Sequence, residues 1–159
     1  MFRNIIRTSD DKVLTLLRLV LAIVVFPHGA QKVLGWFGGF GFSGTYGFLT
    51  QQMHIPAPLA ILVFAAEFLA PIGLFFGFLG RVAAFGIAVD FTVALFMVHL
   101  PNGFFMNWSG QQKGEGIEFF FLAIGIAVAI MIGGSGAWSI DRVLAGDDPL
   151  QLNERSAGS

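Results

Sequence analysis

Six ionisable residues lie within or at the edge of otherwise apolar stretches of the sequence: His28, Lys32, Glu67, Asp90, His99 and Glu118. Imidazole, ammonium and carboxyl groups can exchange protons and hydrogen-bond the polar atoms of a ligand. The stretches around them are long enough to cross a bilayer, where a charged side chain costs about 2.5–3.5 kcal/mol at the helix centre on insertion scales. A simple membrane anchor needs none of these groups. Their presence therefore predicts a site inside the membrane.

Four apolar segments must position these residues, and they run over about 13–34, 58–79, 81–100 and 116–138. About 20 residues at 1.5 Å each cross a hydrocarbon core of about 30 Å. The chain has 159 residues, of which 12% are charged, and its mean hydropathy is +0.76. A soluble domain has about 25% charged residues. The sequence therefore predicts an all-α fold, a four-helix transmembrane bundle over 13–138, between an N-terminal segment 1–12 and a C-terminal tail 139–159.

Basic residues between the segments predict the orientation. The N-terminal segment, the turn between the second and third segments and the C-terminal tail contain Arg3, Arg7, Lys12, Arg81, Arg142 and Arg155. The other two loops with their flanks offer only Lys32 and Lys113. By the positive-inside rule both termini are cytoplasmic in a bacterial-type inner membrane. The outward loops, about 35–57 and 101–115, alternate glycine with aromatic rings, which fits either an interfacial belt or a lid over an outward pocket.

This orientation places four of the ionisable residues in one layer near the outer surface: His28, Lys32, His99 and Glu118. Glu67 falls somewhat deeper. Pro71 follows it by four residues and frees the Glu67 carbonyl, because proline lacks an N–H, so we expect a kink there. Each residue also has a structural alternative, such as snorkelling for Lys32, an interfacial hydrogen bond for either histidine, or a helix-dipole contact for Glu118.

Two other charged residues are expected to lie apart from this layer. Asp90 precedes His99 by nine residues, about half a turn away on an ideal helix. We therefore expect Asp90 to turn to another helix, a partner subunit or a water-filled space. Arg18 lies near the inner end of the first segment, where we expect its side chain to snorkel toward the headgroups.

Composition excludes several chemistries for this chain alone. It has no cysteine, so it can neither exchange disulfides nor ligate an iron–sulfur cluster through thiolates nor attach a c-type haem. A haem held between His28 and His99 is conceivable, but two single histidines on different segments indicate it only weakly. No paired metal-ligand spacing is present, so we expect no metal site. The formal net charge of −1 argues against nucleic acid as a partner.

Several short motifs occur in an order that resembles the DoxX family of small four-helix membrane proteins. They are Arg18-Leu-x-Leu-Ala, His28-Gly-x-Gln-Lys32, Glu67 in a helix with Pro71, Gly80-Arg81, His99-x-x-Asn-Gly-Phe104, Gly116-Ile-Glu118 and Ser139-Ile-Asp141-Arg142. The resemblance covers about residues 14–144. The family takes its name from a small subunit of an archaeal membrane thiosulfate:quinone oxidoreductase, and its members are often labelled oxidoreductases. Asp90 departs from the apolar residue that the resemblance implies at its position.

Two functional hypotheses from different classes remain. In the first, the protein is a membrane subunit of a quinone-linked oxidoreductase. Here His28, Lys32 and His99 bind a quinone or another amphipathic ligand, and Glu67, Glu118 and His99 carry protons. In the second, the protein is a non-enzymatic binding or scaffold protein that organises a partner subunit or a homo-oligomer. Its polar residues then serve as interhelical bonds, worth about 0.6 kcal/mol each on average. Proton-coupled transport is less favoured because no internal repeat is evident.

Overall fold

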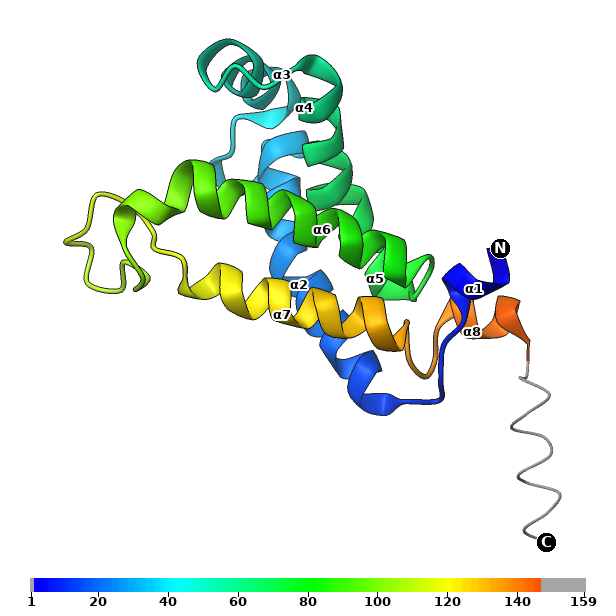
Figure 1. The fold of residues 1–159 in the computed structure, drawn as a ribbon. Helices are drawn as coiled ribbons and strands as arrows, with labels where there is room; N and C mark the ends of the chain where they lie inside the picture. The colour runs from blue at the N-terminus through cyan, green and yellow to red at the C-terminus, as the bar shows by residue number, and fades with distance from the viewer. Residues whose placement is uncertain (1, 147–159) are drawn as a thin grey trace, which may run out of the picture.

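The computed structural model describes residues 2–146, which form helices and connecting loops without a strand (Figure 1). The all-α prediction is confirmed for these residues. The α-helices are α1 (Phe2–Ile6), α2 (Lys12–Leu34), α3 (Gly41–Gly47), α4 (Ala57–Phe64), α5 (Ala70–Phe76), α6 (Gly80–Ala94), α7 (Glu118–Gly133) and α8 (Ile140–Ala145). Three π-helical turns, η2 (Phe48–Gln52), η3 (Ala65–Leu69) and η4 (Leu95–His99), and two 3₁₀ turns, η1 (Trp36–Gly38) and η5 (Leu100–Asn102), complete the set.

Three helical stretches are long and apolar enough to cross a membrane: Lys12–Leu34, Ala57–Phe76 and Gly80–Asn102. They lie close to the first three expected segments. The fourth, expected over 116–138, is helical over Glu118–Gly133 only. Its 16 residues span about 24 Å. Gly134 and Gly136, with φ of 90° and 73°, end the helix because this backbone conformation does not continue an α-helix.

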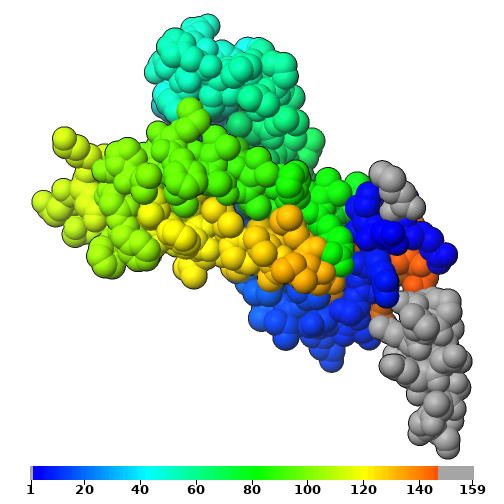
Figure 2. Space-filling view, in the orientation of Figure 1, coloured from blue at the N-terminus to red at the C-terminus, as the bar shows by residue number. Residues whose placement is uncertain are grey.

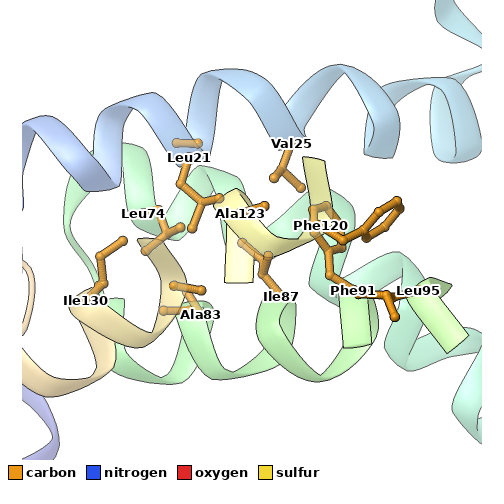
Figure 3. Close-up of a cluster of buried hydrophobic side chains, with 13 residues drawn as sticks. Leu21, Val25, Leu74, Ala83, Ile87, Phe91, Leu95, Phe120, Ala123 and Ile130 are labelled. Carbon is orange, nitrogen blue, oxygen red and sulfur yellow. The ribbon is translucent and has the colours of Figure 1, made fainter. Parts of the chain in front are cut away.

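The long helices pack around one apolar core. α6 and α7 lie side by side, and α2 crosses behind them (Figures 1 and 2). Leu21 and Val25 from α2 meet Leu74 from α5, Ile87 from α6 and Ile130 from α7 in this core (Figure 3). Alanines at the interfaces, including Ala22, Ala84 and Ala127, are buried and let the helix backbones approach closely. Many large apolar side chains face outward, as hydrocarbon chains of lipid require.

Arg18 and Asp141 tie the helix ends together at one side of the bundle. Arg18 is only 2% exposed and donates hydrogen bonds to the carbonyls of Leu74, Phe75, Ser135 and Trp138, at 2.6–2.8 Å. Asp141 accepts from the Leu79 and Gly80 N–H groups at 2.7 and 2.8 Å and from the Ser135 hydroxyl at 2.6 Å. The expectation that Arg18 snorkels is therefore wrong. Its guanidinium instead donates to carbonyls near the C-terminal end of α5 and in the loop that follows α7.

The two ends of the described chain lie on this same side. α1 packs against α8, and Arg3 donates a hydrogen bond to the Ala145 carbonyl at 3.0 Å (Figure 1). An ion pair between Arg142 and Asp10 adds to the contact. The opposite side of the bundle carries the α2–α4 connection and the loop between η5 and α7. The C-terminal tail prediction beyond residue 146 lies outside the described residues.

Candidate functional site

A pocket of about 170 Å³ lies between the helices toward the loop side of the bundle. Four residues predicted from the sequence line it: His28, Lys32, Glu67 and His99. Its other lining residues are Phe91, Ala94, Met106, Glu115, Phe119 and Phe120. The walls thus come from α2, η3, α6, η4, α7 and the loop before α7. Residues from distant parts of the chain meet at this one place.

α2 and η3 supply the charged wall of the pocket. His28 and Lys32 are four residues apart and share one face of α2. Lys32 forms an ion pair with Glu67, whose residue exposure is only 4%. Gly29 permits this approach, because a Cβ at that position would lie 2.0 Å from the Glu67 carbonyl oxygen. A glycine on α2 therefore allows the Glu67 backbone to pass close to the helix.

Both Glu67 and His99 lie in π-helical turns that precede a proline. In η3 the Ala70 N–H donates to the Ala65 carbonyl, and in η4 the Leu100 N–H donates to the Leu95 carbonyl. The next residue is proline in each case, Pro71 and Pro101, and it has no N–H to continue the regular ladder. Single π turns are frequent at functional sites. The kink expected at Pro71 therefore takes the form of a widened turn that carries the Glu67 side chain.

Asp90 is not among the residues that line the pocket. Its carboxyl group interacts with that of Glu67. Asp90 thus turns to another helix, which was one of the three expectations for it, and that helix carries Glu67.

His99 is oriented by a backbone contact. Its Nδ1 lies 2.9 Å from the Glu115 carbonyl oxygen, and its ring centroid lies 4.3 Å from that of Phe120. Because a carbonyl oxygen only accepts hydrogen bonds, Nδ1 carries the hydrogen, and a neutral His99 presents Nε2 as an acceptor. His28 lies near another ring of α7, 6.3 Å from Phe119 between centroids. The pocket therefore combines imidazole groups with aromatic walls.

The acidic residues near the start of α7 differ from the sequence prediction. Glu118 is not among the pocket residues, and its Oε1 accepts a hydrogen bond from Trp108 Nε1 at 3.1 Å. Glu115 lines the pocket in its place, and its Oε2 accepts from the Asn107 N–H at 2.7 Å. Glu115 lies in a polar loop, where hydropathy gave no signal for it. Both carboxylates hold the loop that borders the pocket.

An apolar groove of about 560 Å³ runs along the outside of the bundle between α4–α5 and α6. Asp90 lines this groove, and the remaining fifteen lining residues carry apolar side chains or none, as Leu62, Leu69, Phe85 and Val89 illustrate. Glu67 lines the pocket and Asp90 lines the groove. The two interacting carboxyl groups thus lie between the two spaces.

The pocket can hold one six-membered ring and exchange protons with it. A cavity of about 150 Å³ accommodates a benzene molecule, and this one is of similar size. The Lys32 ammonium donates hydrogen bonds, a neutral His99 accepts at Nε2, and carboxyl groups do either according to their protonation. The geometry therefore suits a flat ring with oxygen substituents.

Comparison with known proteins identifies the family. The DoxX family model matches residues 13–100, more than half of the chain. The chain is 26% identical over 126 residues to the Bacillus subtilis (strain 168) protein named "Putative oxidoreductase CatD", a match that covers 79% of this chain and 82% of that protein. No solved structure matches the chain. With three helices of membrane-spanning length and this match, the chain is a multi-pass membrane protein that belongs to the DoxX family.

Proposed function

We propose that this protein is the ligand-binding membrane subunit of a quinone-linked oxidoreductase. The observation that carries the proposal is the convergence of two histidines, a lysine and two glutamates on one ring-sized pocket between apolar helices. Polar groups that converge in an apolar cavity are typical of small-molecule sites. Ionisable residues inside a membrane protein support a functional site as the first hypothesis.

The lining residues divide into two roles. His28, Lys32 and His99 bind the oxygen substituents of the ring, while Phe119 and Phe120 contact its faces. Glu67 and His99 exchange protons with the bound ligand, since a quinone and its quinol differ by two protons as well as two electrons. We assign Glu118 to holding the adjacent loop through Trp108 instead of to proton exchange.

The electrons must reach a carrier outside this chain. With no cysteine, the chain supplies no thiolate ligands for an iron–sulfur cluster. A redox-active partner subunit therefore accepts or supplies the electrons in this proposal. The oxidoreductase name of the relative in Bacillus subtilis supports the reaction class.

We further propose that both termini are cytoplasmic and that α7 forms the fourth crossing. The described ends lie on one side of the bundle, which requires an even number of crossings. α7 is apolar but short, and a short span is accommodated by local thinning of the bilayer. The pocket then opens near the outer face of an inner membrane, toward the aromatic loops.

Binding of a short-chain quinone analogue to the purified protein tests the proposal. Titration calorimetry in lipid nanodiscs would compare wild type with H99A, K32M and E118Q. Removal of one hydrogen bond to the ligand weakens binding by about tenfold, so H99A and K32M should each lose about this much. E118Q is the matched control, because Glu118 lies outside the pocket. No binding by wild type, or equal affinity in all variants, would refute the proposed site.

A further inference from the structure

Glu67 in η3 and Asp90 in α6 form a pair of carboxyl groups between two packed helical segments. Their carboxyl groups interact directly with each other. Glu67 Oε2 and Asp90 Oδ2 are both buried and have no donor among the described residues. A carboxylate only accepts hydrogen bonds, so a bond between two carboxyl groups requires a proton on one of them. One proton shared between Glu67 Oε2 and Asp90 Oδ2 would give each of these buried oxygens a partner.

The charges around the pair also indicate that it holds one proton. Lys32 forms its ion pair with Glu67 and supplies one positive charge. On the other side Asp90 faces the apolar groove, which offers no polar side chain of its own. Two ionised carboxylates would leave one buried charge without a partner, a costly arrangement in an apolar setting. One carboxylate beside Lys32 and one protonated carboxyl make the group neutral.

We propose that Glu67 and Asp90 hold one exchangeable proton between them, and that this pair is the proton donor and acceptor for a ring ligand in the pocket. Glu67 touches the pocket and Asp90 acts through Glu67, so Asp90 is a positioning and proton-storing residue. In the forward step the carboxyl O–H bond breaks and an O–H bond forms on the ligand oxygen. The reverse step returns the proton to the pair. The proton transfer to a ring ligand rests on the proposed function, whereas the shared proton does not.

Infrared spectroscopy of the ligand-free protein tests the shared proton. A protonated carboxyl has a C=O stretching band that is distinct from the carboxylate bands and that shifts in D₂O when its proton exchanges. We expect this band in wild type at neutral pH, and its loss in both D90N and E67Q. Asparagine matches aspartic acid in size and donates to Glu67, so D90N keeps the contact and removes only the proton. E118Q should retain the band.

Two results would overturn the shared proton. Wild type without such a band at neutral pH would mean that both carboxylates are ionised, with a protonated His28 beside Lys32 as the second positive charge. A band that survives in both D90N and E67Q would place the proton on another residue. Neither measurement needs a ligand, so each outcome stands whether or not a quinone binds.

The number of protons taken up or released during ligand binding tests the proton transfer between the pair and the ligand. Calorimetry in two buffers of different ionisation enthalpy gives the number of protons taken up or released when a quinone or quinol analogue binds. We expect the wild-type number to change in D90N while the affinity changes by less than about threefold, because Asp90 does not contact the ligand. An unchanged proton number in D90N would refute the role of the pair. Absence of binding in wild type would instead refute the proposed function alone.

Discussion

At the scale of single residues, the polar groups of the pocket depend on one another for their charge. Glu67 is almost fully buried, whereas the Lys32 side chain is 34% exposed. Removal of Lys32 would leave the acidic pair without its positive partner. An uncompensated buried charge destabilises a protein far more than loss of a solvent-exposed ion pair does.

K32M should therefore lower the unfolding temperature measured in detergent, by an amount equivalent to about 1–3 kcal/mol. Adding E67Q to K32M should recover part of this loss, because the double variant no longer carries the unpaired carboxylate. A double-mutant cycle on these two residues measures the coupling. Equal stability of K32M and wild type would contradict the expected dependence.

At the scale of helices, the close approach of α2 to η3 rests on Gly29. A methyl group there would collide with the Glu67 backbone. We expect G29A to push the two helices apart, to destabilise the protein by about 1–3 kcal/mol, as overpacking does, and to weaken ligand binding. G125A on α7 is the control, since a Cβ at Gly125 meets no atom within 4 Å. Alanine is also the better helix former, so G125A should be neutral or slightly stabilising. Thermal unfolding and ligand titration of G29A and G125A would test the expected difference in stability and binding.

Pro71 governs the shape of η3. P71A restores an N–H four residues after Glu67, which permits a regular hydrogen bond to the Glu67 carbonyl. We expect the variant to be at least as stable as wild type in thermal unfolding but to bind the quinone analogue more weakly, because the Glu67 side chain rotates. Unchanged affinity in P71A would show that the π turn has no part in placing the carboxyl group.

Sequence reasoning reached part of this arrangement and missed the rest for identifiable reasons. Depth along each apolar segment brought His28, Lys32 and His99 to one level, and the structure places them around one pocket. Asp90 lies outside the pocket, but its contact with Glu67 could not be predicted because it depends on how α6 packs against η3. Glu115 was missed because its position depends on the path of a loop, which hydropathy does not report.

At the scale of the whole molecule, the same reasoning found the class and the limits of the first three helices but not the packing at their ends. Arg18 illustrates the difference. A charged residue near the end of an apolar segment fits both snorkelling and burial, and only the position of carbonyls in α5 and in the loop after α7 decides between them. The short α7 likewise depends on two glycines whose backbone conformation no hydropathy profile shows.

Topology is testable because the chain has no cysteine. Ser9 and Ser109 are both exposed and lie on opposite sides of the bundle. A membrane-impermeant maleimide added to intact spheroplasts should label S109C but not S9C, and permeabilisation should make S9C reactive. Labelling of both before permeabilisation, or of S9C alone, would contradict cytoplasmic termini.

The Arg18 and Asp141 contacts give the molecule an uneven stiffness. The helices are fastened together at one end, while the other ends in long glycine- and aromatic-rich loops beside the pocket. A bundle held at one end deforms most at the other, so lateral pressure and thickness of the bilayer act chiefly on the pocket. Lipid composition is therefore expected to change how fast a ligand enters and leaves while the fold stays intact. Under the proposed function, the membrane itself would then regulate ligand exchange at the site.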